Sequence, residues 1–398
     1  MPPRTAARPG QSPARSQEAI LLLALSSVNT GISLRCVEAM LPELARDFGS
    51  SVAAAAAIIT AFSLGFTVAV LLQGPLGDRY GKLRVVTITG ALAGLASLAC
   101  AAAWDIASLA AFRLLTGALA SGSVALGMAY IGDVVPLEKR QATIARFIAG
   151  SLLGQTLGPL FGGIFTDWLG WRMTFAALGV VFLCVSAVLL VRTAHHWPAA
   201  AAGPFRPLAT HRRLIARPGI RWLATTGVAE TFFFFGAFSF LGAYFKERLD
   251  LSFTTIGAIL AGFGIGGLLY SFSIKWLLRL LGERGLVLAG GILVAILFPL
   301  VVMATHWVYA LPCTIGLGFA FYFVHNTIQT KATEAAPDAR GSAVALYASA
   351  FGFGQGAGVA AMGLAVGFFP LAPMIAVFGI GFLGLGLWLR ANLWRLRP

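Results

Sequence analysis

Charged side chains are scarce in this 398-residue sequence. Asp, Glu, Lys and Arg together make up 11% of it, whereas 58% of its residues are hydrophobic. An average soluble domain carries about 25% charged residues. So little charge excludes a soluble globular domain, because the surface that such a domain presents to water could not be built. We therefore expect an all-α protein that crosses a lipid bilayer many times.

Cysteine and cofactor motifs are also scarce. The four cysteines all lie in apolar runs, without the spacing of metal ligands or of a disulfide framework (Cys36, Cys100, Cys184, Cys313). No G-x-x-x-x-G-K-[ST] loop is present, which argues against an ATP-driven pump. A glycine-rich stretch at 262–267 superficially resembles a dinucleotide loop, but it lies inside an apolar run with no strand before it. We expect no enzyme, no cofactor and no metal site.

Acidic residues are few as well: 15 Asp and Glu stand against 29 Lys and Arg. The basic excess is not spread evenly around twelve apolar runs, which we place at 19–43, 52–76, 85–103, 107–132, 142–166, 171–191, 220–245, 253–274, 286–304, 307–330, 341–368 and 371–389. With both ends on one face, 23 of the 29 basic residues fall on that face, four on the other and two inside runs. This positive-inside bias predicts cytoplasmic termini in a bacterial inner membrane, near anionic headgroups, and argues against a nucleic-acid partner.

The two halves of the chain resemble each other at an offset of 200 residues. Gly154-Gln155 aligns with Gly354-Gln355, and apolar runs and loop charges stay in phase. Two parallel six-helix bundles are therefore expected, with a site between them near the midplane of the membrane. We assign the segments as a disordered cytoplasmic tail (1–18), an N-terminal bundle (19–192), a cytoplasmic linker (193–219), a C-terminal bundle (220–390) and a cytoplasmic tail (391–398). We expect a monomer.

Three stretches resemble known signatures. All three lie in the first half of the chain, between the second and third apolar runs, in the fourth run and in the fifth run. They are the turn Gly74-Pro-Leu-Gly-Asp-Arg-Tyr-Gly-Lys, the pattern Arg113-x-x-x-Gly117 and the run Gly154-x-x-x-Gly158-Pro159-x-x-Gly162-Gly163. Together they resemble the major facilitator superfamily and, within it, the drug/proton antiporter branch. The resemblance implies the twelve-helix, two-bundle fold of that superfamily, and the third run implies an exporter rather than an importer.

The resemblance also implies gating roles. In the family the aspartate of the turn, here Asp78, braces the start of the eleventh helix, here near Gly341. Such a contact is worth roughly 0.3–1 kcal/mol, enough to bias two states without locking them. Pro159 is expected to bend its helix so that the halves can rock. We predict that the gating residues are Asp78, Arg79, Gly81, Lys82, Gly154, Gly158, Pro159 and Gly162; a tight turn and a generic packing helix are the plain alternatives.

Four charges lie inside apolar runs: Arg35, Glu38, Arg113 and Glu230. A centred charge costs about 2.5–3.5 kcal/mol on insertion scales, so its presence invites a functional explanation. We predict proton coupling at Glu38 and Glu230, with Arg113 tuning them as the resemblance implies. The alternatives are a structural Arg35–Glu38 pair, which the three-residue spacing allows, and a buried Arg113–Glu38 pair.

The predicted substrate site lies around the same charges. Phenylalanines follow Glu230, and an acid beside aromatic rings suits an amphiphilic cation. We predict that the substrate contacts Arg35, Glu38, Gln155, Glu230, Phe234, Phe238 and Asn326. The alternative for the phenylalanines is a position that faces lipid, and the alternative for Gln155 is simple packing against a neighbouring helix. For His325 and Asn326 the alternative is a hydrogen bond between helices.

From this pattern we expect proton-coupled efflux of small hydrophobic or cationic drug-like compounds by alternating access. Two arginines in the N-terminal half leave a second possibility of the same class, an exporter of an organic anion or sugar-like metabolite. A third possibility, of another class, is a non-transporting membrane sensor built on a carrier fold.

Overall fold

The structure is a computed structural model that describes residues 13–396 except 198, 200–208 and 337–339. Over these residues it is helical throughout, with short turns between helices. The first half contains α1 (Pro13–Arg35), α2 (Val37–Asp47), α3 (Val52–Ala55), α4 (Ala57–Tyr80), α5 (Lys82–Ala101), α6 (Ile106–Ala120), α7 (Gly122–Val134), α8 (Leu137–Leu169) and α9 (Trp171–Thr193).

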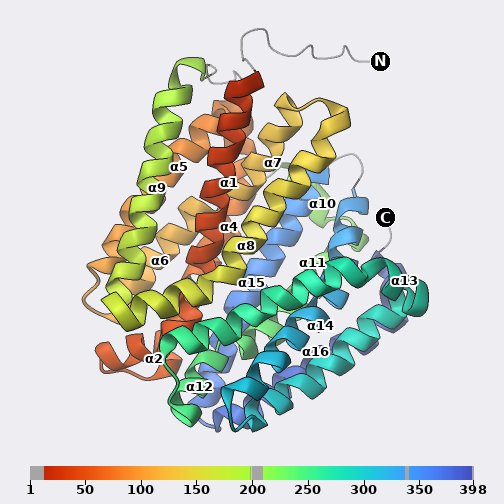
Figure 1. Ribbon diagram of the computed structural model, residues 1–398. Helices are drawn as coiled ribbons and strands as arrows, with labels where there is room; N and C mark the ends of the chain where they lie inside the picture. Colours follow the sequence, from red (N-terminus) through yellow and green to blue (C-terminus); the bar gives the residue numbers. More distant parts are fainter. Residues whose placement is uncertain (1–12, 198, 200–208, 337–339, 397–398) are drawn as a thin grey trace.

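The linker between the halves contains η1 (Ala194–His196) and α10 (Ala209–Ile215). The second half contains α11 (Pro218–Phe238), α12 (Leu241–Leu249), α13 (Phe253–Met303), α14 (Trp307–Glu334), α15 (Arg340–Val366) and α16 (Leu371–Asn392), followed by η2 (Leu393–Leu396). Figure 1 shows the first half from red to yellow-green and the second from green to blue.

Eleven helical segments of the described chain are long and apolar enough to cross a membrane. One of them, α13, has 51 residues, which at 1.5 Å per residue is about 76 Å, more than twice the roughly 30 Å core of a bilayer. Its backbone leaves helical geometry at Gly282, with φ 61° and ψ 174°. Because a side chain disfavours positive φ, glycine suits this reversal. Gly282 divides α13 into two spans and brings the number to the expected twelve.

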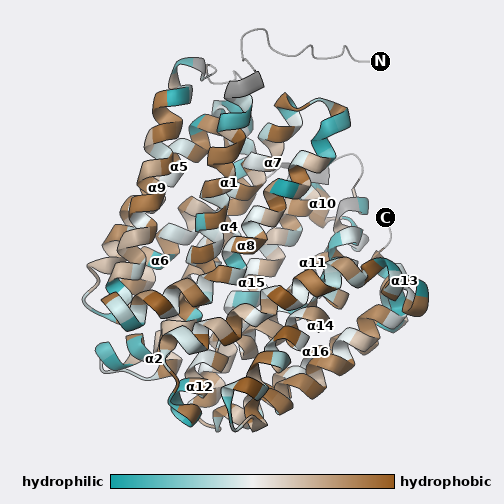
Figure 2. Ribbon diagram, in the orientation of Figure 1, coloured by the Kyte–Doolittle hydropathy of each residue, from teal (hydrophilic) through white to brown (hydrophobic). Residues whose placement is uncertain are grey.

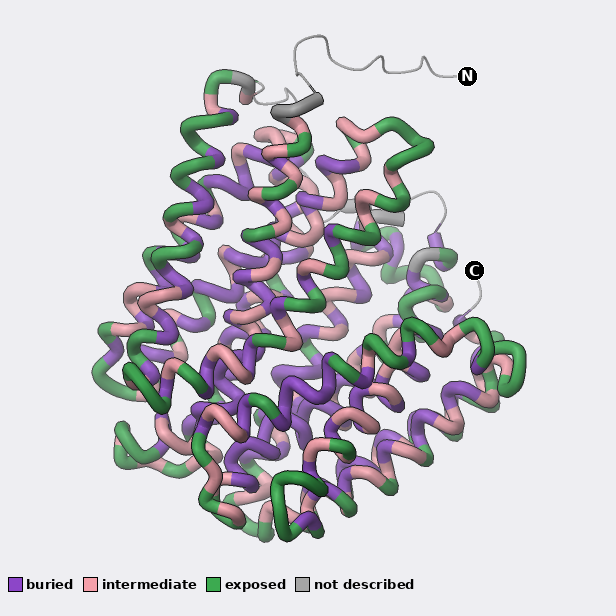
Figure 3. Tube along the Cα trace, in the orientation of Figure 1, coloured by how far each residue is buried: buried purple, intermediate pink, exposed green. Residues whose placement is uncertain are grey.

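Several spans are interrupted helices. The first span changes from α1 to α2 at Cys36, the fourth from α6 to α7 at Ser121, and the seventh from α11 to α12 around Ser239. Figure 2 shows that brown, hydrophobic residues make up much of the long helices. Large apolar side chains on them are exposed, for example Phe272 at 86%. In Figure 3 buried residues follow the inner sides of the helices. This arrangement is what a bilayer requires, since lipid replaces water around the spans.

The structure differs from the expected tail and linker in two places. Residues 13–18, which we assigned to the N-terminal tail, form the first turns of α1, where Glu18 lies 3.2 Å from Arg192 in an ion pair. The linker also contains the short helix α10, which packs against α15 and buries Leu214. Residues 1–12 lie outside the described part of the chain.

The two halves pack against each other through α8 on α13 and α4 on α15, and through the short helices α2 and α12. We call the side on which α1 begins and α16 ends the terminal face, and the side of α2 and α12 the opposite face (Figure 1). Contacts between the halves lie near the opposite face, where Phe253 packs against Gly163. They also lie near the middle of the helices, where Ser349 hydrogen-bonds the Thr67 carbonyl.

Candidate functional site

Arg35 and Glu38 form an ion pair where the first span changes from α1 to α2. Arg35 Nε lies 2.9 Å from Glu38 Oε2, and the two side chains are 2% and 1% exposed. The other carboxylate oxygen, Oε1, accepts a hydrogen bond from Ser239 Oγ at 3.2 Å. Ser239 stands between α11 and α12 in the second half. Glu38 is therefore bonded to both halves of the protein at once.

Aromatic rings of the second half enclose the guanidinium of Arg35. Its Cζ lies 4.8 Å from the ring centre of Phe235, 5.1 Å from that of Phe238 and 5.3 Å from that of Phe263. Cation–π attraction strengthens when the charge is desolvated. Of the two predicted pocket phenylalanines, Phe238 thus faces Arg35. Phe234 is fully buried among other rings in the core of the second half.

Arg113 lies on α6 and is fully buried. Its guanidinium donates to Ser33 Oγ at 3.1 Å and to the Ser33 carbonyl at 2.9 Å, and it stands over the ring of Phe62 at 4.1 Å. Its Nε has no hydrogen-bond partner. The alternative of a buried Arg113–Glu38 pair is wrong for this conformation, because Glu38 bonds to Arg35 instead. Arg113 is therefore a buried cation held by neutral groups, an arrangement that costs free energy unless an anion comes near.

Glu230 on α11 belongs to a triangle of polar groups. His325 Nδ1 on α14 lies 3.0 Å from Glu230 Oε1, and the Tyr347 hydroxyl on α15 donates to Glu230 Oε2 at 3.1 Å. The Tyr347 oxygen and His325 Nδ1 are also 3.1 Å apart. Three spans of the second half meet here. The open question about His325 is thereby answered: it bonds between helices, and its partner is the carboxylate.

The other two predicted substrate residues stand apart from these charges. Gln155 is partly exposed on α8, where its backbone nitrogen approaches Gly31 of α1. Asn326 hydrogen-bonds the hydroxyl of Tyr270. Within the described chain neither amide is seen to hydrogen-bond one of the four intramembrane charges.

Helix α8 uses two different faces. Cβ atoms added at Gly154 and Gly158 would come within 2.2 and 2.8 Å of atoms of α1, and one at Gly162 would lie 2.1 Å from the carbonyl oxygen of Cys36, between α1 and α2. The glycines four apart therefore serve close packing inside the first half. A Cβ at Gly163 would lie 2.1 Å from the Phe253 carbonyl of the second half. The contact between the halves therefore uses the adjacent face of α8. Pro159 lies within α8, which continues through it as one helix.

The charged stretch predicted as a turn at 74–82 stands on the terminal face, but it is mostly helical: α4 continues to Tyr80 and α5 begins at Lys82, so only Gly81 lies between them. Gly81 has φ 92°, and Lys82 pairs with Asp133 at the end of α7. Arg79 stands over the ring of Tyr80 at 5.6 Å. Asp78 is exposed. The region near Gly341 that Asp78 is predicted to brace lies outside the residues whose side chains are described, so this brace stays a prediction.

A second carboxylate joins the halves on the opposite face. Asp167, at the end of α8, accepts hydrogen bonds from the backbone nitrogens of Phe253 at 3.1 Å and Thr254 at 2.7 Å. These nitrogens begin α13, and a negative charge at a helix N-terminus is favourable. Nearby, Asp47 bonds the side chains of Arg172 at 2.8 Å and Trp171 at 2.9 Å. The bonds to Arg172 and Trp171 lower the pKa of Asp47 below its usual value.

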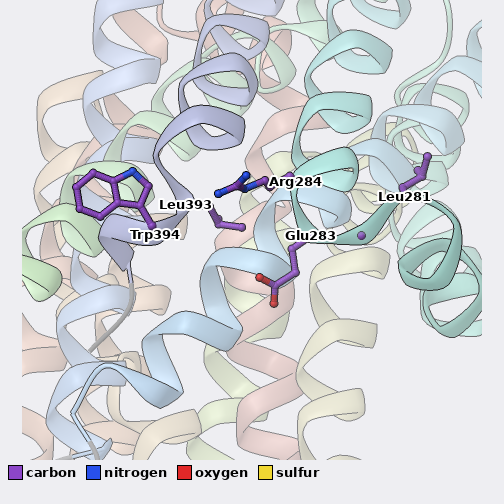
Figure 4. A pocket seen from close by; sticks show the side chains of 6 residues that line it. Leu281, Glu283, Arg284, Leu393 and Trp394 are labelled. Carbon is purple, nitrogen blue, oxygen red and sulfur yellow. The ribbon is translucent and has the colours of Figure 1, made fainter.

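A cavity of about 330 Å³ lies elsewhere, at the terminal end of the second half (Figure 4). It is lined by the reversal in α13 and by η2, through Leu281, Gly282, Glu283, Arg284, Leu393 and Trp394. None of the four intramembrane charges lines it. The cavity is therefore separate from the Arg35–Glu38 pair, which reaches the contact between the halves through Ser239.

Two six-helix halves with a buried ion pair at the contact between them are the architecture of a membrane transporter. The family model of the Major Facilitator Superfamily matches residues 23–359. The chain belongs to the Major Facilitator Superfamily.

Curated relatives of the chain are transporters. It is 27% identical over 253 residues to "Inner membrane transport protein YnfM" of Escherichia coli K12, covering 62% of this chain and 59% of that protein. It is 27% identical over 158 residues to "Efflux pump radE" of Floropilus chiversii (39% and 29% covered) and 28% identical over 204 residues to "Citrate exporter 1" of Aspergillus niger (50% and 38%). These alignments span less than two thirds of each relative.

A solved structure shares the fold over almost the whole chain. A bacterial homolog of the human lysosomal transporter Spinster, crystallised in an inward-facing and unoccupied conformation, superposes with a TM-score of 0.67. The superposition covers 97% of this chain and 95% of that one at 17% sequence identity. The likeness confirms the predicted superfamily fold.

Sequence reasoning did not single out Ser239, Tyr347 or Asp167. Serine and tyrosine are common in membrane spans, and Asp167 stands at the end of a run where an acidic residue is ordinary. One signal was present: His325 and Glu230 are both polar groups in apolar runs, and such groups seek each other. Nothing in the spacing of 95 residues showed that they meet.

Proposed function

We propose that this transporter exports small, largely apolar or cationic compounds across the bacterial cytoplasmic membrane in exchange for protons, by alternating access. The terminal face is then cytoplasmic, in keeping with its basic residues. The observation that carries the proposal is the position of Glu38, a buried carboxylate bonded to Arg35 in its own half and to Ser239 in the other.

Protonation of Glu38 would change both contacts. The neutral carboxyl no longer attracts the Arg35 guanidinium as an ion. A protonated carboxyl oxygen is also a weaker acceptor for the hydrogen bond from Ser239 Oγ. Because a buried charge keeps its partners close, removing it loosens the junction between α2 and α12. Proton binding and separation of the halves on the opposite face are thereby linked, as exchange against a substrate requires.

The charges and rings of the site favour a cation. With His325 neutral, the two buried acids balance the two buried arginines, so loss of a proton from either acid makes the site more negative. The rings of Phe235, Phe238 and Phe263 already hold one cation, Arg35. An amphiphilic cation could replace it on those rings when the halves separate.

A second substrate class, an organic anion, is favoured by Arg113. This buried cation has no carboxylate partner within the described chain, and its Nε makes no hydrogen bond. A carboxylate-bearing substrate would supply what is missing. One relative is named for citrate export. Under this alternative, Arg113→Gln would abolish transport of anions while leaving the transport of cations intact.

The test uses purified protein in proteoliposomes, with cationic and anionic amphiphiles as substrates. Proton flux opposite to substrate flux in the wild type, lost in Glu38→Gln, would support the proposal. Glu247→Gln is the matched control, because Glu247 is an exposed glutamate on α12. Unchanged coupling in Glu38→Gln would remove Glu38 from the proton path. Signalling without any flux would favour the sensor alternative.

A further inference from the structure

We propose that His325 relays protons between water and the buried carboxylate of Glu230, with Tyr347 holding the two groups in register. This inference rests on the proposed proton coupling and adds two residues to it. The relay is a site of its own, since its three members come from α11, α14 and α15 of the second half, whereas the Arg35–Glu38 pair stands on the first span.

The exposures of the two groups differ. The side chain of Glu230 is 0% exposed and that of His325 is 12% exposed. Glu230 can therefore exchange a proton with water only through a neighbour or after a movement of the helices. His325 touches the carboxylate and still reaches the surface of the packed helices, so it is the neighbour through which a proton can pass.

The ring nitrogens of His325 have different tasks. Nδ1 contacts both Glu230 Oε1 and the Tyr347 oxygen. Nε2 makes no hydrogen bond within the described chain and is not among its buried, unpartnered atoms. Tyr347 donates its one proton to Glu230 Oε2. A proton must then lie between His325 Nδ1 and Glu230 Oε1, because two bare lone pairs 3.0 Å apart would repel.

The relay conserves protons at each step. A proton from water binds Nε2 of neutral His325, and the N–H bond at Nδ1 breaks as its proton moves to Glu230 Oε1. His325 is then neutral again with its proton on Nε2, and Glu230 is a neutral carboxylic acid. The freed lone pair of Nδ1 can accept a hydrogen bond from the new O–H group or from Tyr347. The reverse sequence returns the proton to water.

Aromatic rings surround the relay and connect it to the first site. Phe321 stacks on the His325 ring with the ring centres 5.1 Å apart, and Phe351 meets the His325 ring edge-on at 5.5 Å. The ring centre of Phe235 lies 5.4 Å from that of Phe321 and 5.7 Å from that of Phe351. The guanidinium of Arg35 packs over the ring of Phe235, with Cζ 4.8 Å from the ring centre.

The other titratable groups nearby are tyrosines. Tyr322 of α14 lies 5.7 Å from the His325 ring, and Tyr270 of α13 packs against Tyr322. Arg35 is linked to the relay through the ring of Phe235. A transient imidazolium and rapid transfer to Glu230 are what a relay requires.

The test follows the protonation of Glu230 in the full-length protein after a pH jump, by infrared difference spectroscopy. The carboxyl band is assigned by its absence in Glu230→Gln. In His325→Gln, which keeps a hydrogen-bonding side chain but cannot pass a proton, we expect proton uptake by Glu230 to slow at least about tenfold. His306→Gln, at the exposed start of α14, is the matched control and should leave the rate unchanged.

Chemical rescue separates a relay from a purely structural role. In His325→Ala, added imidazole should restore fast uptake, and cyclopentane, which fills space without carrying a proton, should not. Uptake at the wild-type rate in His325→Gln, or rescue by both compounds alike, would overturn the relay. If proton uptake is slowed in His325→Gln but the wild-type protein moves no substrate, the relay is supported and the export proposal is refuted. If proton uptake is unchanged in His325→Gln and proton-coupled export is intact, the relay is refuted and the export proposal is supported.

Discussion

Ser239 of the second half donates a hydrogen bond to Glu38 of the first half, at a point where both spans are interrupted. The bond is 3.2 Å long, and the residues it joins are fully buried. It connects the proposed proton site directly to the contact between the halves. The conformation closed on the opposite face should therefore depend on it.

Removing this bond should open the opposite face. A hydrogen bond contributes about 0.5–1.5 kcal/mol net, so Ser239→Ala should raise the ratio of open to closed molecules by about two- to tenfold. Distances between spin labels on α2 and α12 would report the ratio. Ser273→Ala is the control, because the hydroxyl of Ser273 bonds only the carbonyl of Leu269 on its own helix. An unchanged distance distribution in Ser239→Ala would separate Glu38 from the closure.

Loss of the Asp167 contact should also raise the ratio of open to closed molecules, but by a smaller factor than Ser239→Ala. Asp167→Asn keeps an oxygen near the start of α13 but removes its charge, which is worth about 0.3–1 kcal/mol at an exposed helix N-terminus. We expect up to about a fivefold shift toward the open form, measured with the same labels. Asp105→Asn, which alters an N-cap within the first half, should change stability without changing the distances. Equal shifts in both variants would argue against a specific latch.

Two adjacent glycines should respond differently to the same substitution. Gly163→Ala places a Cβ 2.1 Å from the Phe253 carbonyl of the other half, and Gly162→Ala places one 2.1 Å from the Cys36 carbonyl of the same half. The first variant should fold normally and favour separated halves. The second should lower the thermal stability of the protein, because backbone must move inside the first half. Melting temperatures and label distances, measured on both variants, would show whether the faces are assigned correctly.

The cluster of Asp47, Arg172 and Trp171 should make stability depend on pH. The pKa of Asp47 is lowered in the folded protein by its bonds to Arg172 and then Trp171. Its contribution is therefore fully present above the unfolded pKa of about 3.9 and is lost as the pH falls through the lower folded value.

Since the Asp47 and Arg172 side chains are 44% and 46% exposed, the effect should stay below about 1 kcal/mol. The difference in melting temperature between wild type and Asp47→Asn, measured from pH 7 downward, should shrink below pH 4. A difference that persists at low pH would point to packing instead of charge.

Much of the fold could be predicted from the sequence, because apolar runs of bilayer length are visible one at a time. The twelve spans follow from the runs, and the offset of 200 residues shows the two halves. The interruptions at Cys36 and Ser239 could not be predicted in this way. They depend on the residues that pack around the break, and such residues are far away in the sequence.

The candidate site was predicted from the charges inside the apolar runs, together with nearby aromatic and amide residues. Burial of charge is costly wherever it occurs, so Arg35, Glu38, Arg113 and Glu230 stood out from composition alone. Spacing along one helix also allowed the Arg35–Glu38 pair, three residues apart. The partners of Arg113 and the triangle at Glu230 were beyond reach, because they join different helices.

The sequence by itself determined which residues lie in the membrane and which of them carry charge, since the bilayer selects for apolar runs and penalises every exception. Only the tertiary structure decided what each charge touches. Glycines at 162 and 163 are equivalent in the sequence, yet one meets Cys36 at the junction of α1 and α2 and the other meets the start of α13. The reason is geometric: neighbouring residues on a helix point about 100° apart, and which neighbour meets which helix depends on how all twelve spans pack together.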